Sequence, residues 1–224
     1  MKILIINPNS DEEMTDYIQI TAEKFCKYED NLKIHVVPTP GANSFIGTYK
    51  DIIQSAPGMV KIIQTEERYY DGFLIACGLD PNIDLMKEVS GKPVVGIAES
   101  SMKIATMLGN RFGIIQVSKA SIPRKEELIK KYELHKLGVA IAPEKGSLHF
   151  RNYNQIKEVA VQAIEKYSVE VIVLSCAGMS GLDERLSQEL NIPVLDGIKC
   201  GLSILTGLIK NGYSISKIGK FKGN

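Results

Sequence analysis

The sequence predicts an α/β fold with two similar lobes, each a four-stranded parallel sheet flanked by helices, related by a pseudo-two-fold axis. Two observations carry this prediction. Short apolar runs rich in Val, Ile and Leu alternate with longer segments of helical spacing, and the runs are continuous, as in strands buried on both faces of a parallel sheet. The same plan then returns about 100 residues later, which indicates duplication of a whole lobe.

The first half of the chain supplies four predicted strands with helical segments between them. Helical spacing is clearest at residues 14–27 and 52–69. The apolar runs expected to be strands are 2–6, 33–37, 72–76 and 93–97. This β-α-β-α order is typical of a parallel sheet, because parallel strands need a crossover connection and a helix provides it.

The second half repeats the first in close register. Residues 70–77 align with 169–176, and residues 93–96 align with 193–196. The strands expected here are 112–117, 137–142, 169–175 and 193–196.

The repeat also predicts how the chain divides into lobes. We expect residues 1–98 plus 200–224 to form the first lobe and residues 99–199 the second, with the functional site in the cleft between them. The helix at 201–211 is strongly apolar, so one of its faces must be buried, and we expect it to pack on the first lobe.

Composition restricts the class of partner. The 224 residues are 44% apolar and 24% charged, with a net charge of +1, so no electrostatic argument favours nucleic acid or an anionic membrane. The apolar start of the chain is too short for a signal peptide, and no stretch has the length of a membrane span. We therefore expect a cytoplasmic protein, a homo-oligomer, that acts on a small molecule.

Two of the four cysteines occupy equivalent places in the repeat. Cys77 follows the third strand of the first lobe, and Cys176 follows the third strand of the second. Ligands of open parallel sheets bind beyond the carboxyl ends of the strands, so both thiols are expected to face the cleft from opposite sides. Either cysteine alone would be interpreted as an apolar filler, as we interpret Cys26 and Cys200, but a matched pair favours function.

The residues after each cysteine predict a helix start. Asp80 is a suitable N-cap for a helix beginning at Pro81, and Ser180 with Asp183 resembles a capping box. The N–H groups and the dipole at a helix start stabilise a thiolate.

Two thiols across a cleft are suited to racemisation. One thiolate removes the proton from a carbon next to a carbonyl, and the thiol on the opposite face returns a proton to the planar enolate. Backbone N–H groups can hold the developing oxyanion. This chemistry needs no cofactor and no metal.

Four segments together resemble the hydantoin and allantoin racemases of the aspartate/glutamate racemase superfamily. They are Ile-Asn-Pro-Asn-Ser at 6–10, Ala-Cys-Gly-Leu-Asp-Pro at 76–81, Pro-Val-Val-Gly-Ile-Ala-Glu-Ser at 93–100 and Leu-Ser-Cys-Ala-Gly-Met at 174–179. The resemblance covers nearly the whole chain. It implies an isomerase that works by two-base racemisation, with Cys77 and Cys176 as the bases.

The resemblance also implies a set of substrate-binding positions. Ser10 has an alternative role, since with Glu13 it can form a capping box. Two segments depart from the family's pattern: Ile46 replaces an acidic residue, and Gln116-Val117 replaces a Thr pair. The expected substrate-binding residues are Asn9, Ser10, Ser44, Gly78, Gln116, Val117, Ala177 and Gly178.

The residues beside the cysteines favour a 5-substituted hydantoin or a related cyclic ureide. Gly78-Leu79 and Ala177-Gly178 offer backbone N–H groups, which suit a neutral ring carbonyl, whereas amino-acid racemases of the superfamily place Asn or Thr there to bind a carboxylate. An aspartate/glutamate-type racemase is the nearest alternative. A non-enzymatic ligand-binding protein and a redox switch closing a Cys77–Cys176 disulfide are the others.

The remaining charged residues predict no chemistry. His35, His135 and His149 lie away from the cysteines and are interpreted as structural. Residues 123–127 and 217–222 are expected to be solvated surface.

Overall fold

A computed structural model describes residues 1–27, 29 and 31–223; residue 224, the end of the predicted first lobe, lies outside them. The described strands form two parallel sheets of identical topology, with strand order β2-β1-β3-β4 in one and β6-β5-β7-β8 in the other. The strands of the first sheet are β1 (Lys2–Asn7), β2 (Lys33–Pro38), β3 (Gly72–Ile75) and β4 (Val94–Gly96). Those of the second are β5 (Phe112–Ile115), β6 (Gly138–Ile141), β7 (Val171–Leu174) and β8 (Val194–Asp196).

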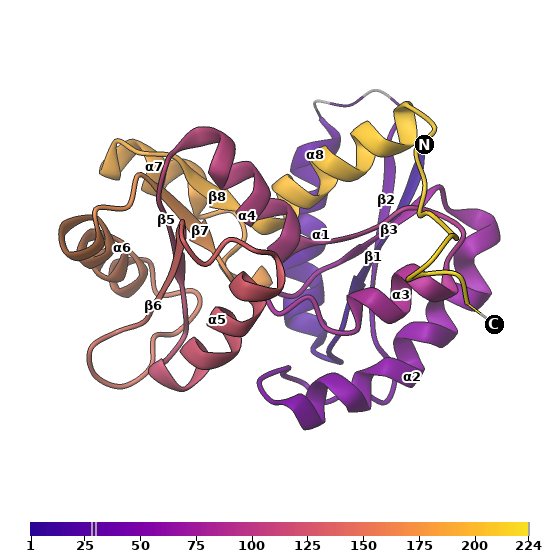
Figure 1. The fold of residues 1–224 in the computed structure, drawn as a ribbon, viewed down its shortest axis with the longest axis horizontal. Coiled ribbons are helices and arrows are strands. Elements are labelled where there is room, and N and C mark those ends of the chain that lie inside the picture. Colours follow the sequence, from indigo (N-terminus) through magenta and orange to yellow (C-terminus); the bar gives the residue numbers. More distant parts are fainter. Residues whose placement is uncertain (28, 30, 224) are drawn as a thin grey trace.

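Helices cover both faces of each sheet, and Figure 1 shows the two lobes side by side. The predicted fold class is confirmed, and each predicted strand matches an observed one to within two residues at each end. The helices are α1 (Glu12–Cys26), α2 (Tyr49–Glu66), α3 (Ile83–Val89), α4 (Ile97–Leu108), α5 (Ile122–Lys131), α6 (Tyr153–Tyr167), α7 (Asp183–Leu190) and α8 (Gly197–Lys210).

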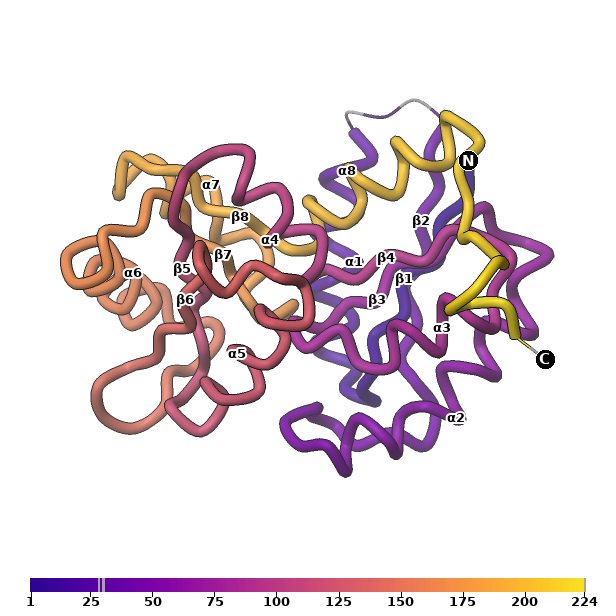
Figure 2. Tube along the Cα trace, viewed as in Figure 1, coloured from indigo at the N-terminus to yellow at the C-terminus, as the bar shows by residue number. Residues whose placement is uncertain are grey.

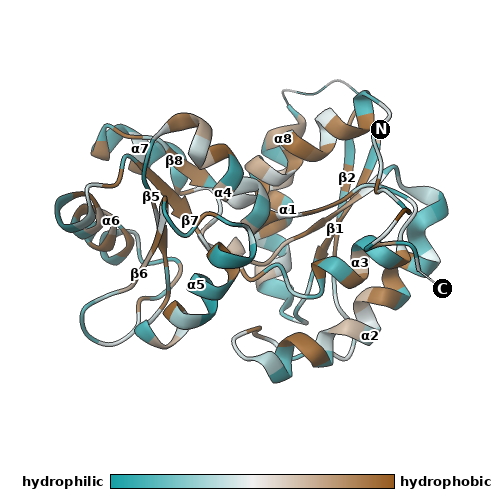
Figure 3. Cartoon of the chain, viewed as in Figure 1, coloured by the Kyte–Doolittle hydropathy of each residue, from teal (hydrophilic) through white to brown (hydrophobic). Residues whose placement is uncertain are grey.

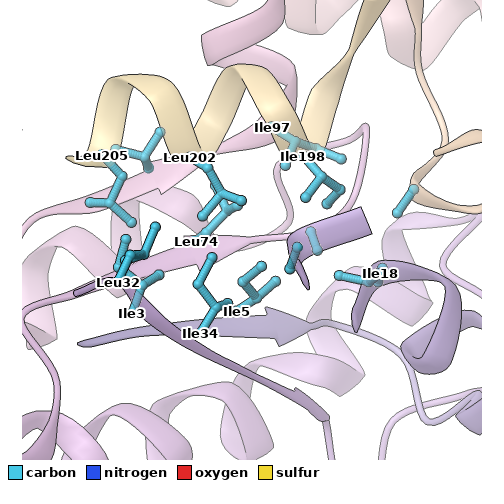
Figure 4. Packing of buried hydrophobic residues seen from close by; sticks show 14 of the residues in the cluster. Ile3, Ile5, Ile18, Leu32, Ile34, Leu74, Ile97, Ile198, Leu202 and Leu205 are labelled. Atoms are coloured by element: carbon cyan, nitrogen blue, oxygen red, sulfur yellow. The ribbon is translucent and has the colours of Figure 1, made fainter. Parts of the chain in front are cut away.

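The central strands β1, β3, β5 and β7 are mostly apolar because both of their faces are buried, and Figure 3 colours much of the interior of the sheets brown. On one face of the first sheet, Leu202 and Leu205 of α8 pack against Ile3, Ile5 and Leu74 (Figure 4). On the other face, α2 and α3 form a separate apolar cluster with β1, β3 and β4. Burial of this kind contributes about 25 cal/mol per Å² of apolar surface.

The two lobes exchange helices at their junction. Helix α4 follows the first sheet, yet its Met102 and Ala105 pack against Phe112 of the second sheet. Helix α8 follows the second sheet and packs on the first, and α4 and α8 contact each other. The crossing places the segments after β3 and β7 at the boundary between the lobes.

The C-terminal tail returns along the first lobe beside α3 (Figure 2). It is mostly exposed, as predicted for residues 217–222. Lys217 Nζ donates to the carbonyl oxygens of Lys87 and Glu88, and Lys220 pairs with Asp84.

The three predicted helix caps are wrong. Helix α1 is capped by Asp11, whose carboxylate accepts from the Met14 N–H, and not by Ser10. Helix α3 begins at Ile83 after an Asn82 that makes no side-chain cap. Helix α7 also lacks a side-chain cap, because the hydroxyl of Ser180 donates to Asp196 instead. The local sequence contains residues suitable as caps, but in the folded protein Asp80 and Ser180 make hydrogen bonds to other segments instead.

Candidate active site

Both cysteines lie just beyond the carboxyl ends of equivalent strands. Cys77 follows β3 and Cys176 follows β7, and each strand occupies the same position in its sheet. Both thiols are free and partly exposed. The fold therefore brings to the lobe boundary the two side chains that the internal repeat had paired.

The segments that carry the cysteines are in direct contact. The Cα of Gly78 lies so close to Ser175 that a Cβ there would overlap the Ser175 carbonyl group. Ala177 of the second lobe is buried in the apolar cluster of the first sheet. The backbones that carry the two cysteines are therefore held next to each other by direct packing.

A cavity of about 320 Å³ opens between the lobes, and both cysteines lie on its wall. Of the predicted site residues, the cavity brings together Asn9, Cys77, Gly78, Gln116, Val117, Cys176 and Ala177. The remaining lining residues are Met14, Phe45, Ile46, Gly47, Thr48, Asp51, Ala76, Leu79, Ser118, Ser121, Arg124 and Ser175. The volume and the largely apolar wall suit a small organic molecule.

Three predicted substrate-binding residues lie off this wall. The backbone N–H of Ser10 donates to the Asn43 carbonyl. Ser44 is exposed, although its neighbours in the same loop line the cavity. Gly178 lies against the ring of Phe150.

Asn9 presents an amide to the cavity. Its Oδ1 accepts from Asn7 Nδ2 at 2.7 Å and from the Asp11 N–H at 3.0 Å, which fixes the side chain. Its Nδ2 points to the sulfur of Met14 at 3.3 Å, a weak acceptor. One amide donor of Asn9 is thus available to a stronger acceptor.

The loop before α2 closes one side of the cavity. Ile46 is buried there, whereas Phe45 is half exposed. Asp51 anchors the loop, because its carboxylate accepts from the N–H of Gly47, the N–H and hydroxyl of Thr48, and Asn43 Nδ2. These hydrogen bonds, first those of the Thr48 and Asn43 side chains, lower the pKa of Asp51 to about 2.

The thiols lie in a setting that opposes ionisation. Burial raises the pKa of Cys77 to about 12, and the N–H of Leu79 bonded to its sulfur opposes that rise. Burial also raises the pKa of Cys176, against the N–H groups of Gly178 and Met179. The donor after Cys77 lies in the turn that precedes α3, not in the helix start predicted at Pro81. The donors after Cys176 belong to the short 3₁₀ helix Ala177–Met179 rather than to an α-helix.

A buried carboxylate stands beside Cys77. Asp80 accepts from the N–H groups of Ala98 and Glu99 at 2.9 and 2.7 Å and from the Tyr132 hydroxyl at 2.7 Å. It therefore caps α4 rather than α3, and burial raises its pKa. Gly96 leaves room for it, since a Cβ there would overlap the Asp80 carboxylate.

Two basic residues of α5 were missed by the sequence prediction, which placed residues 123–127 on a solvated surface. Lys125 is 1% exposed and donates through Nζ to the carbonyl oxygen of Gly78. Arg124 lines the cavity, and its Nε is buried with no hydrogen-bond partner among the described residues. One signal was available: Lys125 has the i, i+3 and i+4 spacing to Ile122, Leu128 and Ile129 that defines a buried helix face.

The described residues lack three further features: a metal-binding cluster, a histidine at the cavity and a membrane-spanning helix. No group of three or more His, Cys, Asp or Glu side chains is placed to hold a metal ion. None of the histidines lines the cavity; His35 bonds to the Tyr70 hydroxyl, and His149 stacks on Phe150. No helix in this part of the chain is long and apolar enough to cross a bilayer.

The chain is similar to known proteins in both sequence and fold. Residues 3–205 match the family model described as Asp/Glu/Hydantoin racemase. The chain is 34% identical to a hydantoin racemase of Pseudomonas sp. strain NS671, in an alignment that covers 99% of this chain and 91% of that protein. It is 30% identical to a hydantoin racemase of Rhizobium meliloti, covering 99% of this chain and 94% of that one.

The structure of an allantoin racemase from Klebsiella pneumoniae superposes on the whole chain with a TM-score of 0.93 at 27% identity, covering 94% of that protein.

Proposed function

The chain belongs to the Asp/Glu/hydantoin racemase family, and from that premise we propose that it racemises a carbon next to a carbonyl, using Cys77 and Cys176 as acid and base. The observation that carries the proposal is that both thiols, held at equivalent strand ends, line one cavity between the lobes. The reaction class is the one that two opposed proton-transfer groups serve best.

The reaction proceeds by two proton transfers on opposite faces of the substrate. The thiolate of one cysteine takes the α-proton, and the electron pair of the C–H bond moves into the carbonyl to give an enolate. The thiol of the other cysteine then donates its proton to the opposite face. The product is the mirror image, and the protonation states of the two sulfurs are exchanged, so proton exchange with water restores the starting state.

We assign to Asn9 the role of stabilising the enolate oxygen. Its Nδ2 faces the weakly accepting Met14 sulfur, and replacing that contact by a bond to an oxyanion gains a charge-assisted hydrogen bond.

A 5-substituted hydantoin or related cyclic ureide is the proposed substrate. The residues after each cysteine carry no polar side chain that could bind a carboxylate. The cavity volume of about 320 Å³ is sufficient for a small ring. The α-carbon of a neutral cyclic ureide is also more acidic than that of an amino-acid carboxylate, because no second negative charge opposes deprotonation.

One observation favours a second candidate, an aspartate/glutamate-type amino-acid racemase. Arg124 brings a cation to the cavity wall, and a guanidinium is a good partner for a carboxylate.

Incubation in D₂O with each candidate substrate separates these possibilities. We would follow optical rotation and deuterium incorporation for 5-alkylhydantoins, allantoin, aspartate and glutamate. Loss of rotation with a hydantoin or allantoin supports the first proposal, and loss with an amino acid alone supports the second. If no member of the panel exchanges its α-proton, while calorimetry detects binding of one of them, the protein is a ligand-binding relative without this activity.

A further inference from the structure

Lys125 is a buried cation placed where the two lobes meet. It extends from α5, whose Leu128 and Ile129 pack on the second sheet, to the Gly78 carbonyl of the first lobe. It borders a small internal space together with Gly78 and Ser175, the two residues whose backbones touch between the cysteines. A lysine so fully enclosed is rare unless a negative charge compensates it.

No carboxylate is in ion-pair contact with Lys125 in the described part of the chain. The acidic group that acts on it most strongly is Asp80, followed by the sulfurs of Cys77 and Cys176. Asp80 already accepts two backbone N–H groups and the Tyr132 hydroxyl. The two thiols are the other acidic groups that act on Lys125. Each sulfur accepts backbone N–H groups only, whereas Asp80 also accepts a side-chain hydroxyl.

The proposed reaction sets a requirement that the thiols cannot meet alone. Each turnover needs one thiolate and one thiol, whichever enantiomer enters, whereas burial favours the neutral form of both. A cation that acts on both sulfurs meets that requirement, because it stabilises a negative charge on either one.

We propose that Lys125 is a positioning residue that holds the Cys77–Cys176 pair in a singly ionised state, with one proton shared between two sulfurs beside one ammonium. This inference deepens the racemase proposal and rests on it for its purpose, but the charge coupling exists whether or not the substrate has been identified. The contact with Gly78 adds a second effect, since it ties the first cysteine's loop to the second lobe.

Several other charged and titratable groups face this pair and enter its pH dependence. Asp80, from the segment after β3, acts on both Cys77 and Lys125, and Arg124 of α5 lines the same cavity. Tyr132, at the end of α5, acts through its bond to Asp80, while Glu99 of α4 pairs with Lys87 and Lys103. Burial, and then Asp80, raises the pKa of Tyr132 well above its usual range, so this phenol stays protonated. Burial lowers the pKa of Lys125 to about 8, against the opposing effect of Asp80 and both cysteines.

The test compares Lys125→Met with Lys125→Arg, and uses Lys130→Met, an exposed lysine of the same helix, as the matched control. The rate of alkylation of Cys77 and Cys176 by iodoacetamide is followed peptide by peptide in mass spectra between pH 6 and 11. Below its midpoint the rate rises about tenfold per pH unit, so a shift of the midpoint is measured as a change in rate at each pH even where the midpoint lies above this range. Loss of the cation in K125M should shift the midpoint for both thiols upward by at least about one pH unit. The K125R variant keeps the charge and should retain most of the reactivity, and K130M should match the wild type.

A folded K125M protein whose two thiols keep the wild-type midpoints would overturn the inference. This readout needs no turnover, so an inactive wild-type protein would count against the racemase proposal alone. The acid limb of kcat/KM should move with the alkylation midpoint wherever activity is found.

Linkage supplies a second measurement should K125M fail to fold. Charge coupling is reciprocal, so Cys77→Ser/Cys176→Ser should lower the pH at which the Cε signal of Lys125 titrates in ¹³C NMR spectra. An unchanged titration in this double variant would also overturn the inference.

Discussion

Gly78 and Ser175 meet backbone to backbone, with the Cα of Gly78 turned toward the Ser175 carbonyl so closely that even a methyl group has no room. Each residue adjoins a cysteine. This contact therefore limits how far apart the backbones of the two cysteines can lie. Preorganised geometry of that kind is what proton transfer to a bound carbon requires.

Gly78→Ala should separate the two cysteine segments. The added Cβ would overlap the Ser175 carbonyl group, so one backbone must move, at a cost of about 3 kcal/mol or more. Urea unfolding would measure the loss, and racemase activity should fall by at least about 100-fold, since misplacement by about 1 Å has effects of that size. Gly207→Ala in α8 is the matched control, because a Cβ there meets no atom within 4 Å and should stabilise the helix by about 0.5–1 kcal/mol. Wild-type stability in G78A would contradict the packing described.

Asp80 and Asp196 cap corresponding helices of the two lobes. Asp80 binds the first N–H groups of α4, and Asp196 accepts from the N–H groups of Ile198 and Lys199 in α8. Replacing either by Ala leaves buried donors unpaired, so each variant should lose about 2 kcal/mol of unfolding free energy. Denaturation curves of D80A and D196A test this, and a loss below about 0.5 kcal/mol in either would argue against its role as a cap.

The unfolding free energy should fall in alkaline solution, partly through Cys200. Burial raises the pKa of this thiol to about 12, so the folded chain keeps a proton that the unfolded chain releases above about pH 9. The stabilisation is complete below about pH 9 and is lost as the pH rises toward about 12, at about 1.4 kcal/mol per pH unit for one proton.

Cys200→Ala removes this proton and should flatten the profile by that slope. Urea unfolding between pH 8 and 11 gives the comparison, in which titration of the lysines cancels. Parallel profiles for the two proteins would mean that the buried thiol does not hold its proton.

Arg124 should affect the enzyme's preference for the 5-substituent of its substrate. Its Nε is buried without a partner among the described residues and the side chain lines the cavity, so an acceptor on the substrate would satisfy it. Arg124→Met should lower kcat/KM for a hydantoin with a carboxylate-bearing 5-substituent about tenfold or more relative to a 5-alkylhydantoin. Equal effects on both substrates would show that the guanidinium does not bind the substituent.

The fold could be predicted from the sequence because its strands are doubly buried and its plan is duplicated. Continuous apolar runs such as β3 and β7 allow few other interpretations, and the register of the repeat paired Cys77 with Cys176 without reference to any tertiary contact. Four short segments at strand ends predict the family, and the match of residues 3–205 to the family model confirms it.

The parts that escaped prediction depend on contacts between distant segments. Asp80 resembles a local N-cap. Because Gly96 has no side chain, the Asp80 carboxylate fits beside it and reaches the start of α4, and a local cap pattern contains no information about this contact. Because Lys125 lies among charged neighbours, the sequence predicts a solvent-exposed side chain. Its partner is a backbone carbonyl 47 residues earlier, which no local pattern encodes.

Deuterium incorporation during the first turnovers tests the two-cysteine mechanism most directly. An enantiopure 5-alkylhydantoin is incubated with the protein in D₂O, and the C5 proton of substrate and product is followed by ¹H NMR after chiral separation. Two opposed thiols predict a product that carries deuterium in nearly every molecule, while the remaining substrate keeps its proton. A product that retains the original proton, or wild-type turnover by Cys77→Ser or Cys176→Ser, would contradict the account.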